Sequence, residues 1–305
     1  MNRNHLALFH AVASYGSITR AAAALRVSQP AVSKQIAELE NSLGTQLLDR
    51  LPRGCRLTEA GTILADYARR WCGLENEAAR AIDEFRGMKR GRLAVGASLT
   101  IGGFLAPKIL AKFHQRFPGV ELQLHIANTE GIQRALMDGS IELGLTEGVI
   151  ATDELDTQVF FQDELVAIAS VKHPLLKKPG VSVKDLAREP FIMREEGSGT
   201  RAVVELALRK KGLKVKPVLS LASPEAIKTA VACGLGVAIV SRLIIEAELE
   251  SRTVDIIALR DFRIHRPLHL QRLRDRAQSP AMQGFQNVLE ECKHRGFGSQ
   301  PNQMM

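Results

Sequence analysis

The spacing of apolar residues in the first forty positions predicts a small helical head. Apolar side chains three residues apart predict a first helix over 4–15, which ends at Gly16. The alanine-rich segment 18–25 predicts a second helix with Ser17 as its N-cap.

A third helix is predicted after Ser28, and its two faces differ in polarity. Val32, Ile36 and Leu39 form one apolar stripe, while the opposite face is polar. Such a helix can lie in the DNA major groove, where Gln, Ser and Lys bind base edges and phosphates. The pattern is that of a helix-turn-helix, with an ordinary helical hairpin and a solvated polar face as the alternative. The predicted DNA contacts in the groove are Ser28, Gln29, Pro30, Ser33 and Lys34.

The segment 45–57 predicts a two-stranded wing with a basic tip. Pro52 and Gly54 mark its turn, and arginines surround that turn. Arginines at a hairpin tip can reach phosphates or the minor groove, although a solvated loop is the alternative. The predicted contacts with the DNA backbone are Arg50, Arg53 and Thr58.

A long amphipathic helix is predicted over 59–88, with Thr58 as its N-cap. Its apolar residues recur every three or four positions over three heptads. A second copy of the same helix is the expected partner, and packing against its own domain is the alternative. The seam consists of Leu64, Ala68, Trp71, Leu74, Ala78, Ile82 and Phe85.

Beyond a hinge at 89–91 the pattern changes to alternating strands and helices. This order predicts an α/β fold with a largely parallel sheet, followed by a disordered tail over 295–305. The predicted strands are 92–97, 120–126, 141–146, 163–170, 190–193, 215–221, 236–240 and 268–273, and the predicted helices are 101–117, 131–138, 183–187, 200–211, 224–233, 242–249 and 280–294.

Charge and cysteine content limit the class of protein further. The 305 residues carry a net charge of +8, and residues 1–58 alone contain seven basic against three acidic side chains, which suits a polyanionic partner. Four widely spaced cysteines without CxxC spacing predict a reducing compartment and no metal site. The sequence shows neither a signal peptide nor a long apolar run, so a cytoplasmic protein without a membrane span is expected.

The head resembles that of the LysR-type transcriptional regulators. The resemblance is carried by LALFHAVASYGSITRAAAALRVSQPAVSKQIAELENSLGTQLLDR and then RLTEAG, and it extends over nearly the whole chain. GASLTIGGFLAP and MREEGSGTR resemble the branch that controls carbon fixation and sulfur assimilation. The family implies a winged helix-turn-helix, a dimerising linker helix, and a two-lobed effector domain like that of periplasmic binding proteins, with an inducer between the lobes. Homodimers or homotetramers are implied as well.

By this resemblance the expected domains are a DNA-binding domain over 1–58, a linker helix and hinge over 59–90, and an effector domain over 91–294. Lobe one is expected to comprise 92–162 and 265–294, and lobe two 163–264.

Two strand-to-helix turns predict an anion site in the cleft between the lobes. Each presents hydroxyls and free backbone N–H groups at a helix N-terminus, although plain N-caps are the alternative. A carboxylate at Glu147 would oppose an anion unless it accepts from a ligand hydroxyl. A nearby run of arginines and histidines, residues 263–272, lacks metal-ligand spacing, so a solvated or interlobe role is expected for it. The predicted effector-binding residues are Ser98, Thr100, Glu147, Ser198, Thr200 and Arg201.

Other functional classes lack their sequence features. No P-loop, HExxH or GxSxG motif occurs, so neither an enzyme nor a bound cofactor is expected. A transport solute-binding protein would need a signal peptide in place of the basic head. The sequence therefore predicts a regulator that binds a pseudo-palindromic operator in double-stranded DNA. A small anionic metabolite would change the arrangement of its lobes, and with it contact with RNA polymerase.

Overall fold

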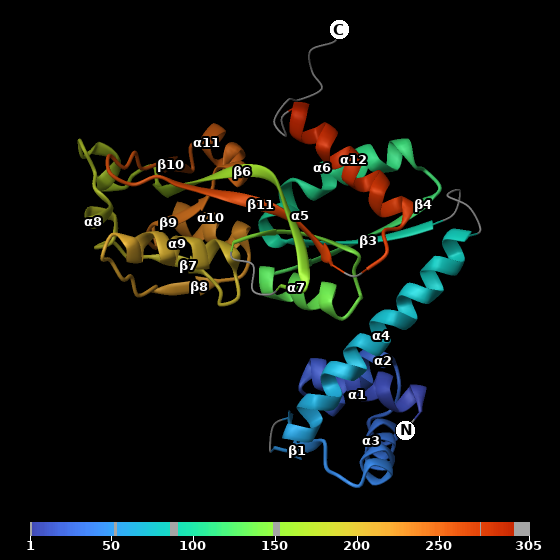
Figure 1. The fold of residues 1–305 in the computed structure, drawn as a ribbon. Coiled ribbons are helices and arrows are strands. Elements are labelled where there is room, and N and C mark those ends of the chain that lie inside the picture. Colours follow the sequence, from blue (N-terminus) through green and yellow to red (C-terminus); the bar gives the residue numbers. More distant parts are fainter. Residues whose placement is uncertain (1, 52–53, 86–90, 149–152, 275, 296–305) are drawn as a thin grey trace. The chain divides into compact units, whose positions relative to one another are not determined.

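The polypeptide separates into two units, each with a hydrophobic core of its own. The structure is a computed structural model, and it describes residues 2–51, 54–85, 91–148, 153–274 and 276–295 (Figure 1). The first unit comprises Met1–Ile82 with Met137–Ser140, and the second comprises Asp83–Leu136 and Ile141–Met305.

Three short helices form the head, as the apolar spacing predicts. Their facing side chains, among them Phe9, Val12 and Leu39, are fully buried in one cluster. Ser17 and Ser28 cap the second and third helices, and Arg26 takes a left-handed conformation, with φ of 56°, in the turn between them. The helices are α1 (Arg3–Tyr15), α2 (Ile18–Leu25) and α3 (Gln29–Leu43).

The predicted wing is an antiparallel pair of strands, β1 (Leu48–Arg50) and β2 (Cys55–Leu57). Glu40 of α3 binds its first strand, because its carboxylate accepts from the backbone N–H groups of Leu47 at 2.8 Å and Leu48 at 3.2 Å. The wing is therefore attached directly to the helix that carries the polar face.

The helix α4 (Glu59–Phe85) follows the wing and uses its apolar residues in two ways. Leu64 and Ala68 of the predicted seam pack into the core of the head, so this part of the seam contacts its own domain. Leu74 remains exposed, and so do two apolar side chains outside the predicted seam, Ile63 and Tyr67. The exposed positions follow one another at helical spacing and form a second stripe. The side chains of Ile82 and Phe85 and the hinge over 86–90 lie outside the described residues, as does the tail over 296–305.

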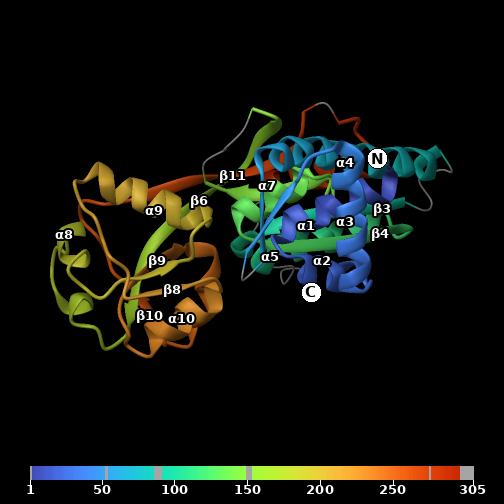
Figure 2. The same cartoon turned by 90° about the horizontal axis from the view of Figure 1, so that it is seen from below.

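The second unit consists of two lobes joined by two long strands, β6 (Leu155–Ser170) and β11 (Ile264–Leu273). These strands run antiparallel and side by side from one lobe to the other (Figures 1 and 2). Phe160 and Leu268 belong to the core of lobe one, whereas Leu165 and Ile264 belong to that of lobe two. The strands therefore pass from one core to the other at about residues 161–164 and 265–267.

In lobe one, α6 and α12 cover one face of the sheet and α7 covers the other (Figure 1). The predicted helix over 101–117 is two helices, because Pro107 lacks the N–H that would bond to Gly103 in a continuous helix. The elements of this lobe are β3 (Gly91–Ser98), α5 (Leu99–Phe104), α6 (Ala106–Arg116), β4 (Val120–Ala127), α7 (Thr129–Met137), β5 (Leu143–Glu147) and α12 (Pro280–Arg295).

Lobe two contains shorter elements around two clusters of buried side chains, one on each side of its sheet. The predicted helix over 242–249 is a 3-10 turn and a short α-helix, and a strand follows that the pattern did not predict. The elements are η1 (Pro174–Lys177), α8 (Val183–Leu186), β7 (Ile192–Arg194), α9 (Gly199–Lys210), β8 (Leu219–Leu221), α10 (Pro224–Ala232), β9 (Ala238–Ser241), η2 (Arg242–Ile244), α11 (Glu246–Glu250) and β10 (Val254–Ile256).

The sheet topology corrects the expectation of a largely parallel sheet. The main sheet has the order β10-β6-β11-β5-β3-β4, with β9 paired to β6. Among the named strands of the described residues, the pairs β3–β4 and β3–β5 and the separate pair β7–β8 are parallel. The pair β6–β11 is antiparallel because these two strands cross between the lobes in opposite directions, and β5, β9 and β10 also pair antiparallel with one of them. Among the described residues, no helix has both the length and the apolarity that a membrane span requires.

Candidate functional site

The polar face of α3 is open to solvent, as a helix that reads DNA requires. Ser28, Gln29, Pro30 and Lys34 are exposed, and Ser33 is half-buried. The Gln29 amide donates to the Ser33 hydroxyl at 3.0 Å. The Lys34 ammonium lies 3.8 Å from Glu38, but its side chain is still 79% exposed. These groups can exchange weak contacts in water for base edges or phosphates without disturbing the core.

Of the three residues predicted to contact the DNA backbone around the wing, the structure describes the side chain of Thr58. Thr58 caps α4, where its hydroxyl accepts from Gly61 N at 3.0 Å and donates to the Gln46 carbonyl at 2.8 Å. Its hydroxyl proton is thus already bonded within the protein. Arg53 and the side chain of Arg50 lie outside the described residues.

In the second unit, three of the predicted effector-binding residues meet between the lobes. Ser98 and Glu147 end neighbouring strands of lobe one, and Thr200 lies in the first turn of α9 in lobe two. The Ser98 hydroxyl donates to one carboxylate oxygen of Glu147, and the Thr200 hydroxyl donates to the other at 3.3 Å. All three side chains are buried. The Glu147 carboxylate therefore links a hydroxyl of one lobe to a hydroxyl of the other.

Arg266 on β11 joins this cluster from the crossing strands. Its Nη1 donates to the Thr200 hydroxyl at 2.7 Å and lies 3.7 Å from Glu147, while its Nε donates to Asp163 on β6 at 2.8 Å. Asp163 also accepts from the Ser241 hydroxyl at 2.8 Å. We name Ser98, Glu147, Asp163, Thr200 and Arg266 the cleft cluster.

The cleft cluster buries two carboxylates against one guanidinium. Burial raises the pKa of the Asp163 carboxyl, although the Arg266 charge opposes this shift. Burial also lowers the pKa of the nearby His269, which favours its neutral form, although Glu147 opposes this. Two buried donors of the neighbourhood, Nη2 of Arg266 and Nε2 of Gln271, have no hydrogen-bond partner among the described residues. The site therefore has donor capacity for an additional acceptor.

Hydrogen bonds between the Thr129 hydroxyl and backbone groups also hold the two lobes together beside the cleft cluster. The Gly199 N–H donates to the Thr129 hydroxyl, which in turn donates to the Glu147 carbonyl, both at 3.1 Å. A Cβ on Gly199 would lie 1.9 Å from that carbonyl oxygen. Only glycine fits this approach of α9 to the end of β5.

The other predicted effector-binding residues do not join the cleft cluster. Thr100 is buried in α5 and makes none of the hydrogen bonds of the cluster. Ser198 caps α9 by accepting from Arg201 N at 3.5 Å. The Arg201 guanidinium donates to Glu205 at 2.8 Å and to the Arg194 carbonyl, and it lines a separate open cavity of about 400 Å³ at the first turns of α7 and α9.

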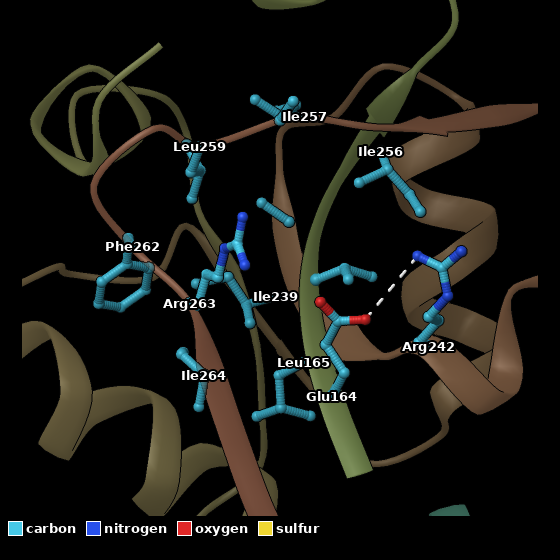
Figure 3. A pocket seen from close by; sticks show the side chains of 13 residues that line it. Glu164, Leu165, Ile239, Arg242, Ile256, Ile257, Leu259, Phe262, Arg263 and Ile264 are labelled. Atoms are coloured by element: carbon cyan, nitrogen blue, oxygen red, sulfur yellow. Dashed lines mark ion pairs between the residues drawn. The ribbon is translucent and has the colours of Figure 1, made fainter. Parts of the chain in front are cut away.

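Lobe two contains a further cavity of about 330 Å³, to which none of the predicted residues contributes. Figure 3 shows it between β6, β9 and the segment 256–264. Glu164 and Arg242 form an ion pair of 3.9 Å on one side, and Leu259 and Phe262 form an apolar wall opposite. Its floor consists of core residues such as Leu165 and Ile239.

Asp163 and Arg266 are site residues that no motif in the sequence predicted. Arg266 belonged to a run for which a solvated or interlobe role was expected, and the structure shows the interlobe position. A signal was available, because Arg266 shares its side of the strand with Ile264 and Leu268, both apolar. An arginine on the apolar face of a strand indicates a buried partner.

Comparisons with known proteins identify both the helical head and the two-lobed part of the chain. Residues 3–62 match the family model described as bacterial regulatory helix-turn-helix protein, lysR family, and residues 86–293 match the LysR substrate binding domain. The chain belongs to the LysR family.

Similar LysR-family proteins carry the names of transcriptional regulators. The chain is 39% identical over 292 residues to a probable RuBisCO transcriptional regulator of Thalassiosira pseudonana, which covers 93% of this chain and 95% of that protein. It is 37% identical to the RuBisCO operon transcriptional regulator of Allochromatium vinosum, with 94% and 95% covered. These names agree with the predicted carbon-fixation branch. The chain is accordingly a transcriptional regulator and not an enzyme.

Solved structures of LysR-family regulators share the fold. The regulatory domain of CcmR from Synechocystis PCC6803, in complex with 2-PG, is 31% identical with a TM-score of 0.63, and the match covers 67% of this chain and 98% of that domain. Full-length CbnR, complexed with its target DNA, is 22% identical with a TM-score of 0.63, and 95% and 99% of the two chains are covered. The predicted fold, a helix-turn-helix head with a two-lobed effector domain, is confirmed.

Proposed function

We propose that this LysR-family regulator binds a pseudo-palindromic operator and is controlled by a small phosphorylated acid in the cleft between its lobes. One observation carries the proposal: polar side chains from both lobes and from the crossing strands meet at the Glu147 carboxylate. They are Ser98 of lobe one, Thr200 of lobe two and Arg266 of β11. Hydroxyls and a guanidinium are the donors that bind carboxylate and phosphate. The 31% identical CcmR domain, solved with 2-phosphoglycolate, supports this class of ligand.

Individual residue roles are part of the proposal. In the groove we assign base and phosphate contacts to Ser28, Gln29, Pro30, Ser33 and Lys34, and along the DNA backbone to Arg50 and Arg53. Thr58 would donate to a phosphate only by releasing the Gln46 carbonyl. In the cleft we assign Ser98, Thr200 and Arg266 to the anion and Ser198 to the cap of α9, and the contact of the anion with Thr100, which is buried in α5, stays a prediction. Arg201 would contribute only by leaving Glu205.

A two-fold operator requires a dimer, and α4 supplies a surface for one. Ile63, Tyr67 and Leu74 are 59%, 62% and 65% exposed and lie four and seven residues apart. Exposed apolar side chains at this spacing favour a second helix as partner. Pairing of two such dimers into a tetramer, and contact of the assembly with RNA polymerase, complete the proposed mechanism.

The function as a whole is tested by selecting genomic fragments with the purified full-length protein. We expect enrichment of a few fragments that contain an imperfect two-fold sequence. We also expect 2-phosphoglycolate to change the position or the affinity of those complexes in a mobility-shift titration. Equal binding of selected and random duplexes at moderate salt would contradict the proposal.

Replacing Lys34 by alanine is expected to flatten the salt dependence of operator binding. A lysine that meets one phosphate releases about one counterion, so the slope of log K against log salt should become shallower by about one unit. Mobility-shift titrations at several salt concentrations measure the slope. Lys184→Ala, an exposed lysine on α8, is the matched control and should leave it unchanged. An unaltered slope for Lys34→Ala would exclude the phosphate contact.

Replacing Tyr67 by glutamate is expected to dissociate the dimer. A charge placed in an apolar helix interface is costly to bury, so the dissociation constant should rise by at least about a hundredfold. Sedimentation equilibrium measures it. Thr62→Glu introduces the same charge on another face of α4 and should leave the dimer intact. A dimer of unchanged strength in Tyr67→Glu would place the interface elsewhere.

A further inference from the structure

The hydrogen-bond donors of the cleft cluster are directed at a side chain of the protein itself. Glu147 accepts from Ser98 through one carboxylate oxygen and from Thr200 through the other, and Arg266 lies 3.7 Å from it. These are the three groups that the proposed function assigns to the anion of the effector. The Glu147 side chain is only 1% exposed, so the carboxylate lies in the interior of the cleft and not at its mouth.

The charge of the cluster makes a second anion unfavourable beside the first. Asp163 and Glu147 already face the single guanidinium of Arg266. His269, which also lies close enough to feel the Glu147 charge, is buried, and its pKa is lowered, so it adds little positive charge. An anion that joined the cluster with Glu147 still in its position would meet a buried like charge, and among the described residues Arg266 is the cation that the printed contacts place in the cluster.

We propose that Glu147 is an internal anion of the cleft, and that an anionic effector binds by displacing its carboxylate from Ser98, Thr200 and Arg266. The inference rests on the proposed function, since it specifies how the same site takes up its ligand. It differs from the arrangement in which Glu147 stays in its position and accepts a hydrogen bond from a ligand hydroxyl.

The same geometry selects among anions. A monocarboxylate would replace the Glu147 carboxylate with a group of equal charge and gain nothing in the exchange. A phosphate group offers at least one acceptor oxygen more than the carboxylate that it replaces. Arg266 Nη2, buried without a partner, is a donor for that additional oxygen. The ligand class is therefore a small phosphorylated compound.

Displacement also explains how binding would reach the lobes. Ser98 belongs to lobe one and Thr200 to lobe two, so the carboxylate is a direct link between them. A ligand that replaces it re-forms this link with a different size and geometry. Carboxylate and phosphate differ in the strength of their hydrogen bonds to the two hydroxyls. This difference in binding free energy then shifts the equilibrium between the arrangements of the lobes.

The test compares wild type and Glu147→Gln as full-length proteins, with inorganic phosphate as the probe in calorimetry. Glutamine keeps the size of the side chain but removes the negative charge, so phosphate should bind at least tenfold more tightly. Glu246→Gln, which removes an exposed charge from α11, is the matched control and should bind phosphate as wild type does. Acetate should bind measurably more weakly than phosphate to both proteins.

The outcomes separate this inference from the proposed function. If wild type binds phosphate or 2-phosphoglycolate but Glu147→Gln binds no tighter, displacement is wrong and the anion site stands. Weaker binding to Glu147→Gln would show that the carboxylate contacts the ligand directly. If no protein binds either anion, both proposals fail.

A second measurement does not depend on how the variant folds. In crystals of wild-type protein grown with phosphate, the Glu147 carboxylate should lie away from Ser98 and Thr200, with phosphate oxygens in its place. Phosphate in the cleft beside an unmoved Glu147 would overturn the inference.

Discussion

Arg266→Met is expected to lower the free energy of unfolding by about 3–5 kcal/mol at pH 7, because it leaves two buried carboxylates without their cation. The Arg266 side chain is 1% exposed and donates to both Asp163 and Thr200. Methionine fills much of the same volume, so the loss reports on charge and hydrogen bonding more than on packing. Urea unfolding followed by circular dichroism measures it.

The loss should grow as the pH rises. Burial raises the pKa of Asp163 above its usual 3.8, and removal of Arg266 takes away the charge that opposes this shift. A carboxyl whose pKa is higher in the folded than in the unfolded state stabilises the fold when protonated, and this stabilisation is lost as the pH rises through the folded-state pKa. The deficit of Arg266→Met should therefore be smallest near pH 4 and larger at pH 7.

Two further variants make this result specific to the buried pair. Arg263→Met changes an exposed arginine on the segment just before β11 and should alter stability by no more than about 0.5 kcal/mol. Adding Asp163→Asn to Arg266→Met should recover part of the loss, since it removes one of the unpaired carboxylates. A loss below about 1 kcal/mol at pH 7 for Arg266→Met alone would contradict the role of Arg266 as their counter-charge.

Gly199→Ala is expected to separate the lobes beside the cleft and to weaken effector binding by at least about tenfold. The new Cβ would lie 1.9 Å from the Glu147 carbonyl oxygen and 2.6 Å from the Thr129 hydroxyl. Backbone has to shift to relieve such an overlap, which costs about 1–3 kcal/mol of stability. Calorimetry with 2-phosphoglycolate and urea unfolding measure the two effects, and operator binding in the absence of effector should be retained.

The control for this prediction is the same substitution where space is free. A Cβ on Gly103, in helix α5 of lobe one, meets no atom within 4 Å. Gly103→Ala should therefore leave effector binding unchanged and stabilise the helix slightly, by up to about 1 kcal/mol. Equal behaviour of the two alanine variants would show that the close approach at Gly199 does not hold the lobes together.

The head follows from its sequence almost residue by residue, because the features that determine it are local. The buried stripe of Val32, Ile36 and Leu39 follows from helical spacing, and the start of α3 follows from the cap at Ser28. The polar face of α3 is exposed for the same reason, since a helix with one face in the core presents the other to water. The sequence also predicted that Ser98 and Thr200 lie close together between the lobes, because both stand where strands end and helices begin.

The long-range arrangement of the effector domain was decided only by the tertiary structure. The family resemblance led us to expect crossings between the lobes near residues 162 and 265. No local signal shows that the chain crosses as two single long strands, so the antiparallel pairing of β6 and β11 was missed. The crossing strands place the Arg266 side chain against Asp163 and Thr200. Arg201 lies in the same turn as Thr200, but its side chain points into another cavity and pairs with Glu205. The sequence by itself determined which segments fold into the head and which turns present hydrogen-bond donors. Only the packing of residues about a hundred positions apart decided that these donors meet on Glu147. The partners of a buried charge depend on which residues the tertiary structure places next to it, and these can be far away in the sequence.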